Sequence, residues 1–346
     1  MRLKTLRLAV LALAALGLVS GCTGGREAFP KLSGPYLGQT PPGDTAQLFA
    51  PGLMNIATET RDMAMTPEGK EIYYTLTPRA MGLSCIMVTR EVNGRWTKPE
   101  VAAFSGHPGV SDVEPFVSPD GRKFYFVSSR ADAEGSSEKA DWDIWVMDRE
   151  GEGWSLPRPM DAPVNSEHNE FFPSLTRDGT IYFSRALKGQ RVHHIYRSRL
   201  VDGKYTEPEK LPEQVNCGTT QFNAFIDPDE RYIIVPVAGR RDSQGGVDYY
   251  IVFRNDDDTW SQPVNMGPQI NTPAMTQWSP YVTPDGKYFF FHLAKSLEGE
   301  FMQDGNTTWS YIQNRSQTPE SGNANMYWIG ADVIDSLKTV ADGLER

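Results

Sequence analysis

The sequence is poor in cysteine and in basic residues. Its 346 residues include 3 Cys, 34 Lys and Arg, and 44 Asp and Glu. Without the three basic residues that precede the first apolar run, 31 basic residues face 44 acidic ones, a net charge near −13. So acidic a chain excludes nucleic acid and anionic lipid headgroups as favoured partners. Cys85 and Cys217 fall in different sequence repeats, so nothing in the sequence supports a disulfide.

Long apolar runs are absent except at the start of the chain. Three basic residues precede the run Leu8–Leu18, which is too short to span a membrane stably. The run ends in Val19-Ser20-Gly21-Cys22, which resembles the lipobox of bacterial lipoproteins. The resemblance implies that residues 1–21 are a cleaved signal peptide and that the Cys22 sulfur is acylated. The alternative is an ordinary secretory signal with a cysteine at its cleavage site.

The implied anchor sets the compartment. Two or three acyl chains on Cys22 would hold the protein durably on a membrane. No later segment has eighteen uninterrupted apolar residues, so we expect no spanning helix. Thr23 is not acidic, which in enterobacterial-type sorting resembles an outer-membrane address. We therefore expect a lipid-anchored protein of the bacterial cell envelope, on the periplasmic or surface side of the outer membrane.

A repeated turn organises the rest of the chain. Residues 22–46 are rich in Gly, Pro and Thr, which predicts a flexible linker. Five copies of a strand, a tight turn and a second strand follow. In these turns proline presets φ, aspartate bonds to the turn backbone, and glycine accepts the positive φ of a hairpin. The five turns are Met65–Gly69, Val117–Gly121, Leu175–Gly179, Ile226–Glu230 and Val282–Gly286.

Two more strands complete each repeat, and four strands per repeat predict a propeller blade. The fourth strand carries an aromatic residue, Ser or Thr, and a proline, which suits an outer strand with an unpaired edge. It is seen as Trp96–Pro99, Trp154–Pro157, Tyr205–Pro208 and Trp260–Pro263. The aromatic residues recur with the blades, so we interpret them as packing residues before ligand platforms.

Together these motifs resemble the WD40-like repeats of TolB-type propellers. The resemblance implies an all-β fold, a five-bladed β-propeller of four-stranded antiparallel blades over residues 47–346. The family's best-known member binds partners in the periplasm and has an additional N-terminal domain, for which we expect no room in this chain. The approximate repeats are 56–107, 108–165, 166–216, 217–271 and 272–346.

The last repeat lacks a fourth strand and ends in Asp332–Val340, whose apolar spacing predicts a short helix. The segment 47–55 precedes the first turn and ends in asparagine, as do the segments that end at Asn165, Asn216 and Asn271. We therefore predict that residues 47–55 complete blade five and close the ring by pairing the two ends of the chain.

Polar residues are expected at the end of the ring where the inner strands begin. We expect basic residues at the ends of the second strands to face acidic ones across this mouth. The alternative is that the charges cap strand ends and order channel water. Two aligned sets lie at the inner strands: Thr60, Asp112, Glu170, Gln221 and Gln277, and then Asp62, Glu114, Phe172, Asn223 and Ser279. The basic set is Arg79, Arg130, Arg185, Arg240, Arg241, His292 and Lys295.

Two insertions between second and third strands reach the same end. They are Ala131–Trp142 and the longer Ala294–Ala324. Long loops inside compact folds are often functional. The second insertion contains Phe301, Trp309 and Tyr311, a mixture suited to stacking a sugar ring or gripping a peptide, although disorder is its plainest alternative.

Carboxylates on successive blades raise the question of catalysis. Five-bladed glycoside hydrolases of the arabinanase type place three carboxylates on the inner strands of successive blades. Asp62, Glu114 or Asp112, and Glu170 have that distribution. Such hydrolysis needs one acid with a raised pKa and another that stays ionised. Because the repeats resemble the TolB type, we favour binding over hydrolysis.

The sequence gives less support to a serine hydrolase or to a metal site. No G-x-S-x-G motif is present, so an attached serine hydrolase is excluded. His193 and His194 lack partners at metal spacing, and Asp256–Asp258 lacks the spacing of a calcium loop. We therefore expect no metal and no other cofactor.

The leading hypothesis is a monomeric envelope lipoprotein whose propeller mouth binds a polar partner, protein or polysaccharide, without a chemical step. The alternative is a glycan-cleaving enzyme that uses the carboxylates of blades one to three. A third hypothesis is an inert structural scaffold.

Overall fold

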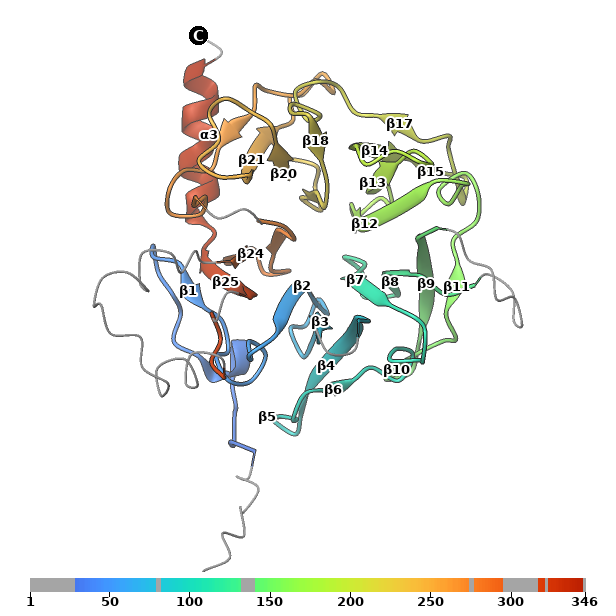
Figure 1. Ribbon diagram of the computed structural model, residues 1–346, viewed down its shortest axis with the longest axis vertical. Helices are drawn as coiled ribbons and strands as arrows, with labels where there is room; N and C mark the ends of the chain where they lie inside the picture. The colour runs from blue at the N-terminus through green and yellow to red at the C-terminus, as the bar shows by residue number, and fades with distance from the viewer. Residues whose placement is uncertain are drawn as a thin grey trace, which may run out of the picture. The chain divides into compact units, whose positions relative to one another are not determined.

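The computed structural model describes residues 29–78, 82–131, 141–273, 277–294, 317–320 and 323–344. Contacts divide the chain into Met1–Pro30 and Lys31–Arg346. Within the second unit the described strands form five antiparallel sheets, arranged in chain order as blades around a ring, and one separate two-stranded hairpin (Figure 1). The prediction of an all-β, five-bladed propeller is confirmed.

The first three blades run from inner to outer strand. Blade one contains β2 (Glu59–Met65), β3 (Glu71–Thr77), β4 (Cys85–Val92), β5 (Arg95–Trp96) and β6 (Glu100–Val101). Blade two contains β7 (Asp112–Val117), β8 (Lys123–Ser128), β9 (Asp143–Glu150), β10 (Gly153–Trp154) and β11 (Arg158–Pro159). Blade three contains β12 (Asn169–Leu175), β13 (Ile181–Ala186), β14 (His193–Ser198) and β17 (Glu209–Lys210), with a side hairpin of β15 (Leu200–Val201) and β16 (Lys204–Tyr205).

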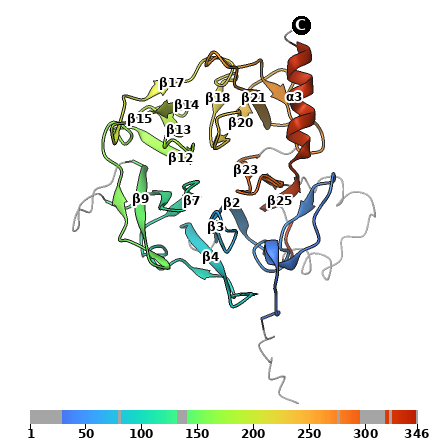
Figure 2. The ribbon, with the colours of Figure 1, turned by 180° about the vertical axis from the view of Figure 1, so that it is seen from behind.

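Among the described residues, blade four has an inner strand in two pieces and blade five has a two-residue inner strand. Blade four contains β18 (Thr220–Gln221), β19 (Phe225–Ile226), β20 (Tyr232–Ala238), β21 (Val247–Phe253) and β22 (Val264–Asn265). Blade five contains β23 (Tyr281–Val282), β24 (Tyr288–Ala294), β25 (Ala324–Gly330) and β1 (Gln47–Leu48). A 3₁₀ helix η1 (Pro35–Gly38) precedes the ring, and helix α3 (Asp332–Leu344) follows it. Figure 2 shows the inner strands facing the centre of the ring from behind.

The ring closes as predicted. Strand β1 pairs antiparallel with β25, with Gln47 opposite Trp328. The side chain of Asn55 then continues the pairing: its Nδ2 donates to the Met326 carbonyl at 3.0 Å, and its Oδ1 accepts from the Met326 amide at 2.9 Å. The first and last described parts of the ring are therefore joined in one blade, which leaves no open edge between them.

The repeated asparagines have one shared function. Each side chain bonds to both the amide and the carbonyl of one third-strand residue, as a backbone segment would. Asn165 does so with Ile144, at 3.0 and 2.9 Å. The pairs Asn216–Ile195 and Asn271–Tyr249 repeat the arrangement. Asparagine suits this position because its amide offers one donor and one acceptor side by side.

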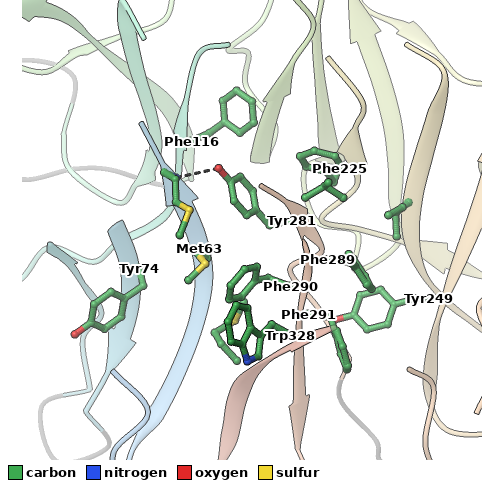
Figure 3. Packing of buried hydrophobic residues seen from close by; sticks show 14 of the residues in the cluster. Met63, Tyr74, Phe116, Phe225, Tyr249, Tyr281, Phe289, Phe290, Phe291 and Trp328 are labelled. Atoms are coloured by element: carbon green, nitrogen blue, oxygen red, sulfur yellow. Dashed lines mark hydrogen bonds between the residues drawn. The ribbon is translucent and has the colours of Figure 1, made fainter. Parts of the chain in front are cut away.

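The core lies within and between the blades, where aromatic rings dominate. Figure 3 shows Tyr281 directed at β2, where its hydroxyl accepts a hydrogen bond from the Met65 amide at 3.0 Å. The Tyr281 ring lies edge-on to Phe225, with centroids 5.8 Å apart. Blades four, five and one therefore meet through a single buried ring, which is 6% exposed.

The segment before the ring differs from our expectation of a flexible linker over residues 22–46. The Trp96 amide donates to the Leu32 carbonyl at 3.0 Å, and the Trp96 indole donates to the Gly34 carbonyl at 2.8 Å. Tyr36 packs edge-on against Tyr288, with centroids 4.8 Å apart. Glycine at 34 takes a positive φ of 87°, which turns the chain back onto the blades. Residues 31–46 are thus tied to blades one and five.

Candidate ligand-binding mouth

The ring has two ends, which we call the entry mouth and the turn mouth. At the entry mouth the inner strands begin and the second strands end. At the turn mouth lie the five hairpin turns. Each inner strand contributes three successive positions to the entry mouth, of which the sequence alignment singled out the first and the third.

The first of these positions is buried and holds the incoming connection. Its five residues, Thr60, Asp112, Glu170, Gln221 and Gln277, have no exposed surface. The Thr60 hydroxyl donates to the Met54 carbonyl at 3.0 Å, and Gln277 Nε2 donates to the Thr272 carbonyl at 2.8 Å. Asp112 accepts hydrogen bonds from the hydroxyls of Ser105 and Ser128. These side chains therefore fasten each inner strand to nearby backbone or side chains.

The arginines at the second-strand ends pair within their own blade. Arg130 Nη2 lies 2.6 Å from Asp112 Oδ1 and also donates to the Phe104 carbonyl at 3.0 Å. Arg185 Nε lies 2.8 Å from Glu170 Oε1. We expected basic groups to face acids across the mouth, but the strand register places Arg130 and Arg185 directly beside the acid of the adjacent strand, and Arg240 pairs with Asp242 in the loop after its own strand. Arg79 and Lys295 lie outside the described residues.

Glu170 is shielded as well as paired. Burial raises its pKa to about 7, although the hydroxyl and amide of Ser166 and the guanidinium of Arg185 act in the opposite direction. Both of its oxygens accept from Ser166, at 2.7 and 3.3 Å. The carboxyl is therefore enclosed by protein groups.

The third position lies at the axis and has an unusual backbone. All five residues have positive φ, between 50° and 59°: Asp62, Glu114, Phe172, Asn223 and Ser279. In the first three blades a shift of strand register accompanies this residue. Asp and Asn tolerate left-handed backbone better than other non-glycine residues, whereas Glu and Phe do so at a cost. A bulge at this point turns side chains or amides toward the axis.

Two carboxylates at the axis connect all five blades. Glu114 Oε1 accepts from Arg61 Nη2 and from Asn223 Nδ2, each at 3.1 Å, and Oε2 accepts from the Phe172 amide at 2.7 Å. Asp62 Oδ2 lies 2.7 Å from Arg61 Nε and accepts from the Glu114 amide at 3.3 Å. Asp62 Oδ1 accepts from the Ser279 hydroxyl. Every oxygen of the two carboxylates therefore has a protein donor.

The electrostatics of this axial network depend on burial. Asp62 is 1% exposed and Glu114 is 4% exposed. Burial raises the pKa of Glu114 to about 7, against the lowering effect of Arg61 and with a raising contribution from Asp62. A carboxyl with such a pKa beside another carboxylate has the electrostatics of a general acid. Its oxygens, however, point at protein donors.

The middle position carries the residues that the sequence reasoning missed. Between the two aligned sets lie Arg61, Val113, Phe171, Phe222 and Trp278, all partly exposed except Val113. Arg61 lies over the Trp278 ring, 5.5 Å from its centroid. Aromatic residues in three blades at one alignment column were the signal available in the sequence.

These rings belong to an arc that crosses blades two to five. We define the aromatic arc as Trp142, Phe171, His193, Phe222, Trp278 and His292. Neighbouring ring centroids along it lie 6.0, 5.4, 6.2, 5.9 and 6.0 Å apart. The first five rings are partly exposed, whereas His292 is 1% exposed. The entry mouth thus carries a continuous set of ring faces and edges.

Several polar atoms in and beside the arc are buried without a hydrogen-bond partner. They are His193 Nδ1, Gln221 Nε2, Gln277 Oε1, Trp278 Nε1 and both ring nitrogens of His292. Burial and the nearby Arg61 charge lower the pKa of His292 to about 3, so its ring is neutral at physiological pH. Buried polar atoms in proteins are usually paired, so this group requires an explanation.

The turn mouth is built differently. It contains a cavity of about 450 Å³ lined by the hairpin turns of all five blades and the first turn of α3. Phe116 and Tyr281 are among the residues that line it. Its polar rim is paired: Arg231 Nη2 lies 2.7 Å from Asp227 Oδ1, and Arg177 Nε lies 2.7 Å from Asp229 Oδ1.

Some of the predicted site residues cannot be placed. Cys22 and Trp309 lie outside the described residues, as do Phe301, Tyr311 and most of the two insertions. In the described ranges, Cys85 and Cys217 are free thiols, and no three His, Cys, Asp or Glu side chains gather as a metal site. The described helices include none with the length and apolarity to cross a membrane.

Comparison with known sequences gives one partial match. No protein-family model matches the chain. A xylosidase/arabinosidase of Butyrivibrio fibrisolvens is 30% identical over 133 residues, which make up 37% of this chain and 25% of that protein. The chain therefore matches only a quarter of the relative's length.

Comparison with solved structures gives neighbours of low sequence identity. TolB from Acinetobacter baumannii has a TM-score of 0.46 at 16% identity, over 79% of this chain and 57% of that one. A GH43 endo-arabinanase from Bacillus licheniformis has a TM-score of 0.44 at 13% identity, over 79% and 94%. An exo-1,5-α-L-arabinanase from a bovine ruminal metagenomic library has a TM-score of 0.43 at 15% identity, over 69% and 89%.

Proposed function

We propose that this protein is an envelope lipoprotein of the WD40-like, TolB-type repeat family, whose entry mouth binds a polar partner without a chemical step. The observation that carries the proposal is the aromatic arc. Partly exposed rings from several blades offer a rigid apolar surface with polar edges, which is the usual composition of a ligand site. The protein would act as a monomer, held to a membrane through Cys22.

The axial network supports binding over catalysis. A catalytic acid must reach the leaving oxygen, and a base or nucleophile must reach water or the sugar carbon. In Asp62 and Glu114 every carboxylate oxygen already accepts a hydrogen bond from the protein. Glu170 is held in the same way by Ser166 and Arg185. These carboxyls join blades and strands.

Photo-crosslinking in intact cells tests the binding proposal. A photoreactive phenylalanine analogue replaces Phe222 in the full-length lipoprotein, and in a matched variant it replaces Val201, which is 52% exposed on the outer hairpin of blade three. We expect a discrete adduct from position 222 and none from position 201. Equal labelling at both positions, or none at 222, would contradict a binding role for the entry mouth.

Fractionation tests the anchor separately. Wild type should enter the membrane fraction and incorporate labelled palmitate. Cys22→Ser should lose the label and the processing that depends on the lipobox. Membrane association that persists unchanged in Cys22→Ser would overturn the lipoprotein proposal while leaving the mouth proposal standing.

One observation favours a second candidate, a glycan-cleaving enzyme. The raised pKa of Glu114, close to the carboxylate of Asp62, is the electrostatic pattern of a glycosidase acid and its partner. The relative from Butyrivibrio fibrisolvens is named for cleavage of xylosides and arabinosides. For the protein to act as an enzyme, the substrate would have to displace Arg61 or Asn223 from Glu114.

Turnover on defined oligosaccharides separates the two candidates. Wild type, Asp62→Asn, Glu114→Gln and Glu170→Gln are incubated with arabino- and xylo-oligosaccharides, and reducing ends are measured. The binding proposal predicts no release by wild type. Release by wild type that falls at least about 100-fold in Glu114→Gln would instead establish the enzyme.

A further inference from the structure

Six buried polar atoms that lack a hydrogen-bond partner lie at one end of the ring. His193, Gln221, Gln277, Trp278 and His292 contribute six such atoms, all at the entry mouth. The residues that line the turn-mouth cavity contribute none. The contrast points to a ligand at the entry mouth, because a random loss of pairing would affect both ends.

The atoms offer both donors and acceptors. The Trp278 indole nitrogen and the Gln221 amide nitrogen can only donate, and the Gln277 amide oxygen can only accept. A neutral imidazole at His292 donates through one nitrogen and accepts through the other. A hydroxyl group both donates and accepts, so several hydroxyls on one ligand would match this mixture.

The positions of these atoms follow the arc. Gln221 precedes Phe222 and Gln277 precedes Trp278 in the chain, so at each place a buried amide and a partly exposed ring come from successive residues at the start of an inner strand. The Phe222 and Trp278 centroids are 5.9 Å apart, and Trp278 and His292 centroids are 6.0 Å apart. Ring faces next to hydrogen-bonding groups suit a sugar, which has an apolar C–H face and a rim of hydroxyls.

Charge narrows the class of sugar. Three partly buried arginines at the entry mouth are each paired with a buried acid: Arg61 with Asp62 and Glu114, Arg130 with Asp112, and Arg185 with Glu170. Arg240 is paired with the half-exposed Asp242, and Arg241 is exposed. An acidic saccharide would have to break a buried ion pair to gain Arg61, Arg130 or Arg185, which is costly. A neutral saccharide needs no such exchange.

We propose that the polar partner of the entry mouth is a neutral oligosaccharide, with its sugar faces on Phe222 and Trp278 and its hydroxyls at Gln221, Gln277, Trp278 Nε1 and His292, directly or through one water. This inference rests on the proposed binding function and specifies its ligand. A protein partner is the outcome that the test must exclude.

Calorimetric titration of the full-length lipoprotein in detergent tests the ligand class. Neutral arabino-, xylo-, galacto- and gluco-oligosaccharides are compared with oligogalacturonates. We expect at least one neutral series to bind, with affinity that rises with chain length. Trp278→Ala should weaken it at least 10-fold, and Trp278→Phe, which keeps a ring face without the indole donor, about 3-fold.

Two further variants make the hydrogen-bond argument specific. Gln221→Glu replaces a donor by an acceptor at nearly constant volume and should weaken binding about 5-fold. Arg177→Ala, at the turn mouth with a side chain 59% exposed, should leave it unchanged. Thermal melting of each variant checks that the fold is retained, so that a loss of binding in an unfolded variant is not counted.

The outcomes separate this inference from the function beneath it. Binding of oligogalacturonates alone overturns the neutral class. Failure of every saccharide, together with a Phe222 photo-adduct that is protein, overturns the sugar inference and keeps the binding mouth. If no saccharide binds and position 222 gives no photo-adduct, the sugar inference and the binding function are both overturned. A crystal structure of saccharide-soaked protein that shows the six atoms paired by ordered water only would also count against the sugar.

Discussion

The two mouths of the ring are made by the same five repeats but differ in what repeats. At the turn mouth nearly the same residues recur in every blade, because a tight hairpin needs them. In four of the five turns a glycine with positive φ donates its amide to the Ser or Thr carbonyl three residues earlier, as Gly121 does to Ser118 at 2.8 Å. At the entry mouth the equivalent residues differ from blade to blade.

The difference separates the residues that the fold requires in every blade from the residues that vary between blades. One backbone geometry, the left-handed residue at the axis, is shared by all five blades, yet its side chains are Asp, Glu, Phe, Asn and Ser. This backbone geometry belongs to the fold, whereas each blade fills the axis with a different residue. Around them the aromatic arc occupies blades two to five and leaves Arg61 in blade one, so the mouth is asymmetric.

The largest expected effect follows from the axial network. Asp62→Ala removes a buried carboxylate, breaks its ion pair with Arg61 and leaves the Ser279 hydroxyl without its acceptor, while Arg61 keeps Glu114 and the Glu114 amide keeps the Thr75 hydroxyl. We expect a loss of about 3–5 kcal/mol in the free energy of unfolding, because removing one partner of a buried ion pair is strongly destabilising. Urea denaturation followed by circular dichroism measures it.

The matched control lies at the turn mouth. Asp229→Ala breaks an exposed pair with Arg177, whose side chains are 50% and 59% exposed. Its expected cost is about 0.5 kcal/mol, since exposed pairs contribute little. Equal costs for the two variants would show that the mouths do not differ in how their charges are used.

Much of the fold was predictable because its signals are local and repeated. The five turns carry their own chemistry in five consecutive residues. The asparagines at 55, 165, 216 and 271 mark the point where each connection rejoins a third strand, and this recurrence correctly predicted ring closure. A repeated local signal is sufficient here because each blade pairs mainly within itself.

The site was less predictable because it depends on the direction in which each side chain points. The sequence alignment located Asp62 and Glu114 correctly at the inner strands, but it placed Arg130 and Arg185 across the mouth. Strand register decides which neighbour an arginine meets, and a bulge interrupts the simple alternation of side chains. For the same reason a search for charges passed over Phe222 and Trp278, which lie one residue away from the aligned polar positions.

The second-largest expected effect is a pH dependence of folding stability that arises from two carboxyls at the entry mouth. Burial raises the pKa of Glu114 and of Glu170 to about 7, above the unfolded value near 4.5. The folded state then holds more protons than the unfolded state between those values, so stability should fall as pH rises from about 4.5 to 7. We expect the melting temperature to drop by several degrees across that window.

The variant Glu114→Gln isolates this contribution. It cannot ionise, so its melting temperature should change less between pH 4.5 and 7 than that of wild type, whatever its absolute value. Scanning calorimetry at half-unit pH intervals gives the two slopes. Parallel slopes would mean that Glu114 does not titrate in this window and that the axial carboxyl is ionised throughout.

The smallest effect has the opposite sign and lies at the turn mouth. Although partial burial opposes ionisation, hydrogen bonds from Thr176 and Thr180 lower the pKa of Asp178. Its contribution to stability is therefore present above about pH 4 and is lost as pH falls through the lowered folded value. Asp178→Asn keeps an acceptor for the Thr180 amide, so we expect a cost of only about 0.5 kcal/mol at pH 7, measured by urea denaturation. That cost should shrink toward zero once the pH falls below the lowered pKa of Asp178, where wild type is protonated as well. A cost that grows on acidification would place Asp178 with the buried acids of the entry side and would remove the distinction between the two mouths.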